Sequence, residues 1–279
     1  DGCQAERVAF SVEDKLRVAH RLDELGVAYI EGGWPNETNP RDREFFRLAQ
    51  KETWTCARIA AFGSTRRGGV RPQEDGILAE LVASRAPVIA IFGKSWDMHA
   101  TDVLRVSLEE NLAMIQDSVA FLKGHAEEVV FDGEHFFDGY KANPEYALNT
   151  LEAAVAGGAD LVCLCDTNGG CMPWEIEEMV AVVAERLGAP LGIHCHNDSG
   201  TAVANSLAGV RAGCVQVQGT MNGFGERAGN ANLCAVIPNL ELKLDVSCLP
   251  EGNLVGLTAA SKFVSELANL PHDHRQPYV

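Results

Sequence analysis

A short polar segment, residues 194–198, reads His-Cys-His-Asn-Asp and directly follows the apolar run 189–193. The apolar run predicts a buried strand, and residues two apart on a strand point to the same face. His194 and His196 would then place two imidazoles together where a strand meets a loop, which is half of a metal site. Taken alone, the pair could also be two core histidines held by hydrogen bonds. Cys195 would point to the opposite face, so we interpret it as packing rather than as a ligand.

Other polar residues follow the remaining predicted strands, and in a parallel barrel all of these strand ends meet on one rim. They are Asp1, Glu31, His99, Asp132, Glu134, the Asp-Thr-Asn segment 166–168 and the loop 222–230. Two neutral imidazoles with oxygen donors suit a divalent ion such as Zn²⁺, Mn²⁺ or Co²⁺, and suit Mg²⁺ less well. A role as a helix cap is the alternative for each of these residues, and we interpret Asp198 or Ser199 as such a cap. Cys163 and Cys165 share a strand face and are interpreted as core.

The elements that must position these residues alternate between strand and helix patterns, as repeated parallel βα units do. Ser11 is placed to cap one helix, and Pro40 and Pro144 suit the first turns of two others. The predicted strands cover residues 27–30, 59–62, 88–92, 129–131, 161–164, 189–193 and 215–218.

Seven strands are one fewer than a (β/α)₈ TIM barrel contains. We therefore expect an α/β fold of this type in which the first strand lies largely upstream of Asp1. An open, doubly wound sheet is the alternative, since it needs no further strand. In the barrel interpretation, residues 1–245 form a catalytic barrel truncated at its N-terminus. Residues 246–279 would begin a post-barrel linker or subdomain that is also truncated.

The composition excludes several classes of protein. Hydrophobic residues make up 46% of the 279, enough for a large core, and the formal net charge of −16 argues against binding nucleic acid or an anionic membrane. The nine cysteines lack paired Cys-x-x-Cys spacing, which favours reduced thiols in the cytoplasm. No apolar run is long enough to span a bilayer, and no signal sequence opens the chain. We expect a cytoplasmic protein with small-molecule substrates and no membrane or nucleic-acid partner.

The glycine-rich segment 223–228, Gly-Phe-Gly-Glu-Arg-Ala, supports a second hypothesis. It matches the G-x-G-x-x-A fingerprint, which predicts an NAD-dependent oxidoreductase. However, it falls in the last βα unit rather than the first, and Glu226 would repel a pyrophosphate. It also leaves His194 and His196 without a role. A third hypothesis is a catalytically silent barrel retained for interaction.

Three segments, in order along the chain, carry a family resemblance: residues 1–4 (Asp-Gly-Cys-Gln), residues 194–198, and the loop 223–230 (Gly-Phe-Gly-Glu-Arg-Ala-Gly-Asn). Together they resemble the DRE-TIM metallolyase family. The loop is similar to that of the Claisen-condensing branch, which contains 2-isopropylmalate, homocitrate and citramalate synthases. Lyase relatives such as hydroxymethylglutaryl-CoA lyase carry a cysteine in that loop. Similarity to the citramalate synthases in particular lies in segments 31–35, 95–99 and 134–141.

The resemblance implies a (β/α)₈ barrel that holds a divalent metal, Mn²⁺, Mg²⁺, Zn²⁺ or Co²⁺. The ligands that it implies are Asp1, His194, His196 and Asn230. The substrate contacts that it implies are His99, Glu134 and Thr167, and we assign catalytic roles to Glu134 and Gln4.

Three of the charged residues have further interpretations. Glu134 could instead be a strand-end carboxylate hydrogen-bonded to backbone. Glu226 and Arg227 are interpreted as an ion pair that shapes the metal loop from outside the ligand set, rather than as direct catalysts.

The implied reaction is a metal-dependent condensation of acetyl-CoA with a 2-oxo acid, with pyruvate giving citramalate and CoA in isoleucine biosynthesis. Synthesis of 2-isopropylmalate or homocitrate is the alternative within the family. We expect a homodimer for the full-length protein. In the family, a catalytic Arg precedes the metal-binding Asp and would lie upstream of Asp1, and later residues also reach the active site. We therefore expect residues 1–279 alone to be weakly active or inactive.

Overall fold

Seven parallel strands, hydrogen-bonded to one another in chain order, form the centre of the computed structural model, which describes residues 1–279. They are β1 (Tyr29–Gly33), β2 (Arg58–Ser64), β3 (Val88–Lys94), β4 (Glu128–Glu134), β5 (Leu161–Asp166), β6 (Leu191–Cys195) and β7 (Gln216–Gln218). All seven predicted strands are confirmed. Because the strands are parallel and neighbours in sequence are neighbours in space, their carboxyl ends meet on one rim.

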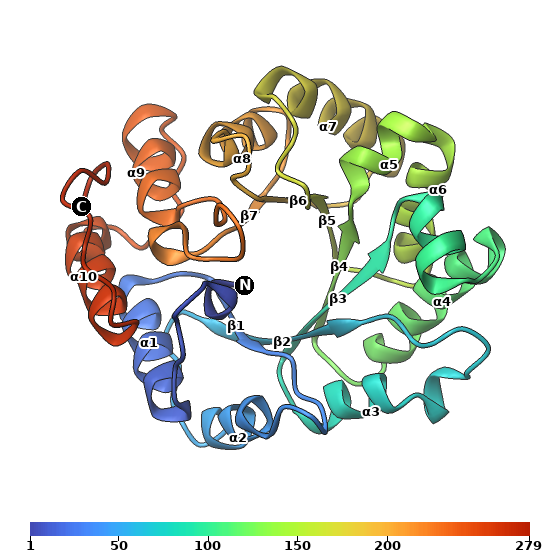
Figure 1. Cartoon of the computed structure of the whole chain (residues 1–279), viewed down its shortest axis with the longest axis horizontal. Coiled ribbons are helices and arrows are strands. Elements are labelled where there is room, and N and C mark those ends of the chain that lie inside the picture. The colour runs from blue at the N-terminus through green and yellow to red at the C-terminus, as the bar shows by residue number, and fades with distance from the viewer.

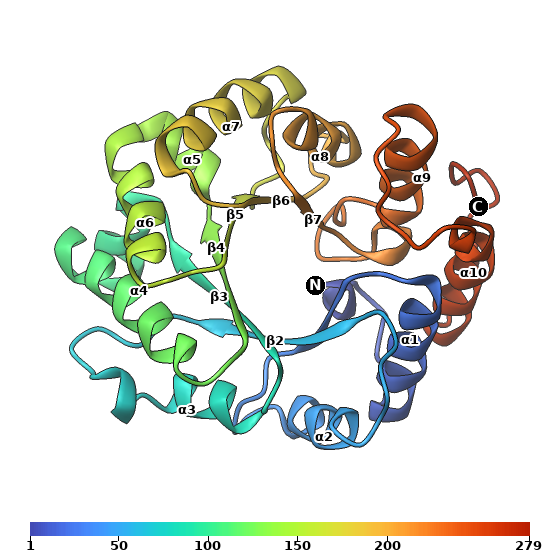
Figure 2. The same cartoon turned by 180° about the vertical axis from the view of Figure 1, so that it is seen from behind.

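The α-helices surround the ring of strands on its outer side (Figures 1 and 2). They are α1 (Val12–Leu25), α2 (Pro40–Ala49), α3 (Gly76–Ala83), α4 (Leu108–Lys123), α5 (Phe136–Ala142), α6 (Pro144–Ala156), α7 (Pro173–Leu187), α8 (Ala202–Arg211), α9 (Leu233–Lys243) and α10 (Leu257–Leu267). Short helical turns are η1 (Gly2–Gln4), η2 (Pro72–Glu74), the π-helix η3 (His99–Leu104), η4 (Met221–Gly223) and η5 (Asn253–Gly256). Helices on one side of the sheet confirm the barrel type of α/β fold, whereas a doubly wound sheet has helices on both faces.

The ring of strands is not closed by hydrogen bonds, because β7 pairs only with β6 and β1 pairs only with β2. The N-terminal turn η1 lies inside the ring beside the gap between β7 and β1 (Figures 1 and 2). Outside this gap, α10 packs against α1. Leu25, Leu257 and Val264 belong to a small apolar cluster that joins these two helices. The proposed division of the chain at residue 245 stays a prediction.

Side chains alternate between the two faces of each strand, so the core has two layers. The inner layer fills the ring and contains Ala60, Val88, Ala90, Val130, Leu161, Cys163 and Cys165. The larger outer layer lies between strands and helices and includes Cys195, which is 1% exposed. The predicted packing roles of these three cysteines are therefore confirmed. All nine cysteines are free thiols.

Helix α1 ends in a tight cap, and the first strand therefore begins later in the sequence than predicted. Gly26 adopts φ of 94°, its N–H donates to Asp23 O, and the N–H of Val27 donates to Leu22 O. This is the Schellman arrangement, in which the residue after the glycine packs back on the helix. The prediction that a strand begins at Val27 was therefore wrong by two residues, and β1 begins at Tyr29. At the other end of α1, Ser11 forms the predicted cap, with Asp14 completing a capping box.

The predicted helix cap at Asp198 or Ser199 was wrong. Helix α8 begins at Ala202, its N-cap is Thr201, and Gly200 precedes it with φ of 72°. Asp198 is instead paired with Arg227. A turn therefore separates the polar segment from the helix.

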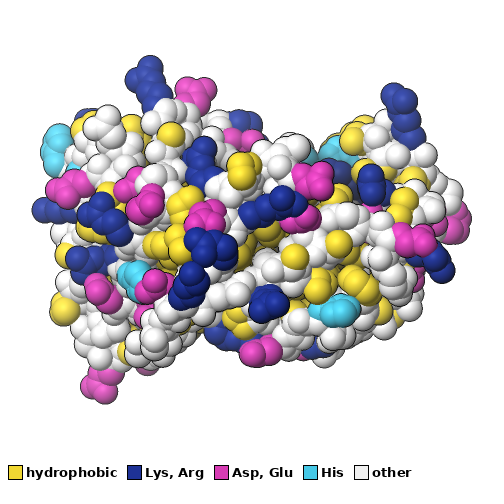
Figure 3. All heavy atoms as spheres, turned by 90° about the horizontal axis from the view of Figure 1, so that it is seen from below, with side chains coloured by type: hydrophobic (Ala, Val, Ile, Leu, Met, Phe, Trp, Pro, Cys, Tyr) yellow, Lys and Arg dark blue, Asp and Glu magenta, His cyan; other side chains and the backbone are white.

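The outer surface mixes charges of both signs. On the face seen from below in Figure 3, Lys and Arg side chains are interspersed with Asp and Glu side chains. No helix combines the length and the apolar composition that crossing a bilayer would need.

Candidate metal centre and its cavity

Asp1, His194 and His196 bring three potential ligand atoms within 4.8 Å of one another at the carboxyl rim of the strands. His194 Nε2 lies 3.1 Å from Asp1 Oδ2 and 3.1 Å from His196 Nε2. Asn230 donates its Nδ2 hydrogen to the same Asp1 oxygen at 2.9 Å. The structure therefore brings the four residues predicted as ligands together, although they come from opposite ends of the chain.

Backbone hydrogen bonds fix Asn230 beside His196. The two residues form an isolated antiparallel bridge, and the N–H of Asn197 donates to Gly229 O at 2.8 Å. Gly225 leaves room for the Asn230 side chain, since a Cβ at that position would lie 2.4 Å from Asn230 Oδ1. The glycine-rich loop is thus a strap that presents Asn230, and at least one of its glycines is required by close approach.

Arg227 ties the strap to two neighbouring loops. Its guanidinium donates to both Asp198 oxygens at 2.9 and 2.8 Å, to Thr167 O at 2.8 Å and to Glu226 Oε1 at 2.5 Å. The hydrogen bonds from Arg227 lower the pKa of Asp198. The contact predicted between Glu226 and Arg227 is present, and sequence reasoning missed the stronger bidentate pair with Asp198. The effect of this cluster on metal binding stays a prediction.

The donor set fits a divalent cation. Asn230 Oδ1 is buried and accepts no hydrogen bond, which is unusual for a buried amide oxygen. In this orientation Oδ1 faces Gly225 while Nδ2 faces Asp1, and turning the amide over by 180° would bring Oδ1 to the ligand cluster, where a cation would satisfy it. One carboxylate, two imidazoles and one amide oxygen form a mixed nitrogen and oxygen set of the kind that binds Zn²⁺ or Mn²⁺.

The protonation of His196 also suits a ligand. Burial, together with the charges of the neighbouring His194 and Arg227, lowers the pKa of His196 to about 3. A histidine binds metal through its neutral imidazole, so His196 is in the binding form throughout the physiological pH range.

Asp1, His194 and His196 lie in the wall of a cavity of about 730 Å³. Gln4 and Glu134, the two predicted catalytic residues, line the same cavity, and so do Thr167 and Glu226. His99 is not among the lining residues. It packs edge-on against His135, with ring centroids 4.5 Å apart, and also against Trp96. Burial lowers the pKa of His99, and His135 lowers it further.

Two side chains that line the cavity, those of Glu134 and Thr167, also contact other residues of the protein. Glu134 forms an ion pair with Lys94, and both residues stand at matched positions of neighbouring strands. Thr167 Oγ1 accepts a hydrogen bond from His135 N–H at 2.9 Å. The hydroxyl hydrogen of Thr167 therefore remains available to a molecule in the cavity.

An aromatic cluster forms one wall of the cavity. Trp34 meets Phe92 and Phe62 edge-on at centroid distances of 5.6 and 6.1 Å, and Phe62 and Phe92 stack at 5.6 Å. All three residues line the cavity. Each ring of this wall is supported by the other two, and the wall is apolar except for the indole N–H of Trp34, which is buried and has no hydrogen-bond acceptor.

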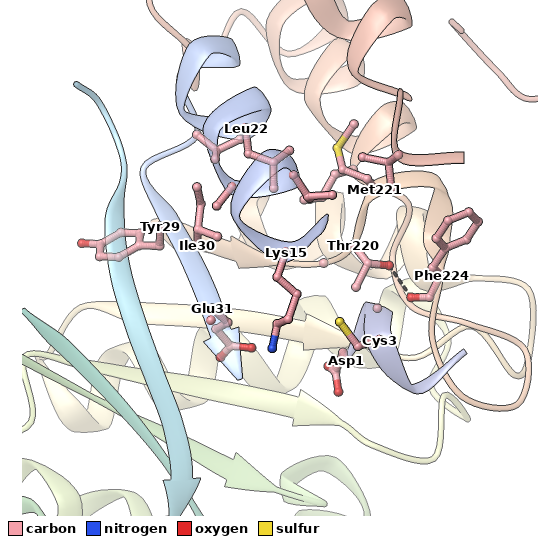
Figure 4. Close-up of a pocket in the computed structure, with 18 of the residues that line it drawn as sticks. Asp1, Cys3, Lys15, Leu22, Tyr29, Ile30, Glu31, Thr220, Met221 and Phe224 are labelled. Atoms are coloured by element: carbon pink, nitrogen blue, oxygen red, sulfur yellow. Dashed lines mark hydrogen bonds between the residues drawn. The ribbon is translucent and has the colours of Figure 1, made fainter. Parts of the chain in front are cut away.

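A second, narrower hollow of about 200 Å³ extends from the metal centre into the gap between β1 and β7. Figure 4 shows that Lys15 and Glu31 point toward each other near Asp1, while Leu22 and Met221 lie at the apolar end. The hollow therefore has a charged mouth beside the candidate ligands and an apolar interior.

One polar residue inside the ring, Gln218, was missed, and Asp132 was predicted only as a rim residue without a partner or role. Gln218, the last residue of β7, contacts both His194 and Asp132. Burial, together with the charge of Glu31, raises the pKa of Asp132 to about 7. The alternation of β7 places Gln216 and Gln218 on the inner face, so sequence could have pointed to the face but not to the partners.

The dinucleotide alternative is not supported by the loop geometry. A nucleotide fingerprint opens a helix whose N-terminus faces the pyrophosphate. Here α9 begins only at Leu233, with Asn232 as its N-cap, and the glycine loop folds over Asn230 instead.

Comparisons with known proteins show the family of the chain. The HMGL-like family model matches residues 1–264. The (R)-citramalate synthases of Aquifex aeolicus and Geobacter sulfurreducens are each 56% identical to this chain over its whole length, which covers 53% of theirs. A homocitrate synthase of Methanopyrus kandleri is 36% identical over 97% of this chain and 64% of its own length. The chain thus spans about half the length of the citramalate synthases that it matches.

Solved structures show the same fold. The HMG-CoA lyase of Bacillus subtilis superposes with a TM-score of 0.81 at 22% identity, covering 99% of this chain and 93% of that chain. At that identity the likeness concerns the fold alone. The match of the family model, together with citramalate synthases 56% identical over the whole chain, shows that this chain belongs to the HMGL-like family.

Proposed function

We propose that this chain forms the catalytic barrel of an enzyme that condenses acetyl-CoA with pyruvate to give citramalate and CoA. The observation that carries the proposal is the convergence of Asp1, His194 and His196 on a cavity that Glu134 and Thr167 also line. The (R)-citramalate synthases, 50–56% identical over the whole chain, support the same reaction. The activity of the full-length protein is part of this proposal.

Metal binding is the first element of the proposed chemistry. A divalent cation held by Asp1, His194, His196 and Asn230 would act as a Lewis acid toward the ketone and carboxylate of the 2-oxo acid. The protein holds these four side chains through the strap of residues 223–230 and its contacts to the neighbouring loops.

Thr167 and Glu134 act on the substrates directly in this proposal. Thr167 donates its free hydroxyl hydrogen to a carboxylate oxygen of the 2-oxo acid, while His135 N–H holds its oxygen in place. Glu134 moves a proton between the reacting groups, and Lys94 holds the carboxylate at the cavity wall. Overall, the acetyl methyl group loses a proton and forms a bond to the ketone carbon. The ketone oxygen gains a proton, and water cleaves the thioester to release CoA.

The aromatic wall supports pyruvate over larger 2-oxo acids. Trp34, Phe62 and Phe92 line the same cavity as Glu134, and their rings support one another. A methyl group fits against such a wall with little displacement. A branched or charged side chain would require the rings to move or would leave a charge against apolar surface.

The test is CoA thiol release from acetyl-CoA, measured in the full-length protein with pyruvate, 2-oxoisovalerate and 2-oxoglutarate, with and without a chelator. Release that requires pyruvate and is abolished by the chelator would support the proposal. Preference for 2-oxoisovalerate or 2-oxoglutarate would assign the chain to 2-isopropylmalate or homocitrate synthesis instead. No thiol release with any acid would exclude the condensation.

Three further expectations stay predictions. The full-length protein would be a homodimer, it would be cytoplasmic, and residues 1–245 would form the catalytic unit. Size measurement of the full-length protein tests the first, and cell fractionation tests the second. For the third, thiol release is measured in a variant whose contacts between α10 and α1 are disrupted. Retained activity would indicate that residues 1–245 catalyse the reaction without support from residues 246–279.

A further inference from the structure

Gln218 joins a candidate metal ligand to a buried carboxylate inside the ring of strands. Its Oε1 lies 3.0 Å from His194 Nδ1. Its Nε2 donates to Asp132 Oδ1 at 2.9 Å and, at the longer distance of 3.5 Å, to Gln216 Oε1. Each of these polar atoms comes from a different inward-facing side chain of β4, β6 or β7.

The two ends of the Gln218 amide are not interchangeable in this setting. When Asp132 is ionised, both groups that face Nε2 are oxygens that accept hydrogen bonds, so the NH₂ end of the amide points toward them. The carbonyl oxygen Oε1 is then left facing His194. Since Oε1 only accepts, Nδ1 of His194 carries a proton, and in the neutral imidazole, the form that binds metal, Nε2 then keeps a lone pair.

Without this constraint, the opposite tautomer of His194 would be favoured in the metal-free protein. His194 Nε2 lies 3.1 Å from the carboxylate oxygen of Asp1. A proton on Nε2 would make a charge-assisted hydrogen bond to that oxygen. A lone pair on Nε2 faces the same oxygen with repulsion until a cation lies between them. Local contacts at the rim therefore oppose the tautomer that binds metal.

We propose that Gln218 is a positioning residue that holds His194 in its metal-binding tautomer, with Asp132 fixing the direction of the Gln218 amide. The inference rests on the proposed metal site and concerns a residue outside the ligand set. Outer partners of this kind, when changed, weaken metal binding about 10–100-fold. Here the direct partner of His194 is the side-chain amide of Gln218, and the Asp132 carboxylate is connected to His194 only through that amide.

The experiment measures the tautomer directly in the 279-residue chain without metal, by nitrogen-15 NMR of labelled histidine. It then measures Zn²⁺ affinity by calorimetry. Gln218→Met keeps the length of the side chain and removes the acceptor. We expect His194 to shift toward the Nε2–H form and Zn²⁺ affinity to fall about 10–100-fold. Gln218→Glu combined with Asp132→Asn exchanges the carboxylate and the amide, so that an acceptor stays at His194 Nδ1 and a donor stays at the other end of the side chain. This double variant should keep the Nδ1–H form with Zn²⁺ affinity within a few-fold of wild type, on the order of 1 kcal/mol.

Gln116→Met, the same substitution at an exposed position of helix α4, is the matched control. It should leave the tautomer unchanged. Gln218→Asn, which withdraws the amide by one methylene, gives a second measure if Gln218→Met does not fold, and should show the same shift. An unchanged tautomer and unchanged Zn²⁺ affinity in Gln218→Met or Gln218→Asn would overturn the inference. A tautomer shift without Zn²⁺ binding by the wild-type chain would support the role of Gln218 and overturn the metal site.

Discussion

Arg227 and Asp198 share two hydrogen bonds across the rim, from Nε to Oδ1 at 2.9 Å and from Nη2 to Oδ2 at 2.8 Å. Asp198 lies two residues after His196, and Arg227 lies three residues before Asn230. The pair therefore joins two loops that each carry a candidate ligand. A bidentate pair fixes direction as well as distance, so its effect should be greatest on the geometry of the metal centre.

Replacing Arg227 with Leu should weaken Zn²⁺ binding about 10-fold, at the lower end of the range for outer partners of metal sites. The free energy of unfolding should change by less than about 1 kcal/mol, since the pair is partly exposed and screened by solvent. Calorimetric titration and urea unfolding measure the two effects. Arg186→Leu is the control, because Arg186 is also bidentate to a carboxylate, that of Glu145, on the outer helices.

Replacing His196 with Ala should abolish metal-dependent CoA release in the full-length protein. The imidazole is a proposed ligand, and its loss should cost more than the roughly 100-fold upper range for outer partners. Bound metal, measured after gel filtration, should fall in parallel. Activity and metal content both retained in this variant would contradict the ligand assignment.

Replacing Phe92 with Ala should widen the cavity beside Glu134. We expect the ratio of kcat/KM for 2-oxobutanoate to that for pyruvate to rise about 10-fold, because one methylene in an apolar pocket changes selectivity about 10–200-fold. Steady-state thiol release with the two acids measures the ratio. Phe121→Ala, on the outer helix α4, is the control for general loosening, and it should leave the ratio unchanged.

Replacing Asp23 with Asn should destabilise the fold in a pH-dependent way. Asp23 is buried and accepts hydrogen bonds from the N–H groups of Thr55, Cys56 and Ala57 at 2.7–3.1 Å. Burial alone would raise the pKa of Asp23, but these backbone donors outweigh it and lower the pKa below its ordinary value. The carboxylate thus stabilises the fold above the unfolded pKa of about 3.9, and this stability is lost as pH falls through the lower folded pKa.

The variant should lose about 1–3 kcal/mol at neutral pH, the usual cost of a buried hydrogen-bonding group left without its partner. The difference from wild type should shrink in acid, as the wild-type carboxylate becomes protonated. Urea unfolding at several pH values measures this difference. Asp245→Asn, at an exposed position, should change stability by less than about 0.5 kcal/mol at every pH. A pH-independent difference for Asp23→Asn would argue against the backbone donors as its cause.

The number of strands could be predicted from sequence because each strand is a short apolar run between helix patterns. Their ends were harder to predict. Val27 was predicted as the start of β1, but it follows the glycine that ends α1, and its N–H donates back to Leu22 O in the helix cap. Asp198 was predicted as a helix cap, but the cap is Thr201, three residues later. The carboxylate of Asp198 instead forms an ion pair with Arg227. At Val27 one local pattern, the helix cap, outweighs another, whereas at Asp198 a contact 29 residues away in sequence decides the role of the carboxylate.

The candidate ligands could be predicted because two stand on one strand and two belong to distinctive segments. Gln218 and Asp132 could not be paired in the same way. Strand alternation places each inside the ring, but 86 residues separate them. Their contact depends on the stagger of the strands around the ring, which the sequence of one strand does not specify.

The unpaired edges of β1 and β7 have a consequence for local opening of the fold. Strands with one free edge exchange their amide hydrogens through smaller fluctuations than strands paired on both sides, such as β3 and β4. Asp1 leads into α1, which packs on β1, whereas His194, His196 and Asn230 stand on the β6 and β7 side. A cation bound by these four residues would therefore hold the β1 side and the β7 side together. Slower amide exchange in β1 and β7 would then indicate bound metal.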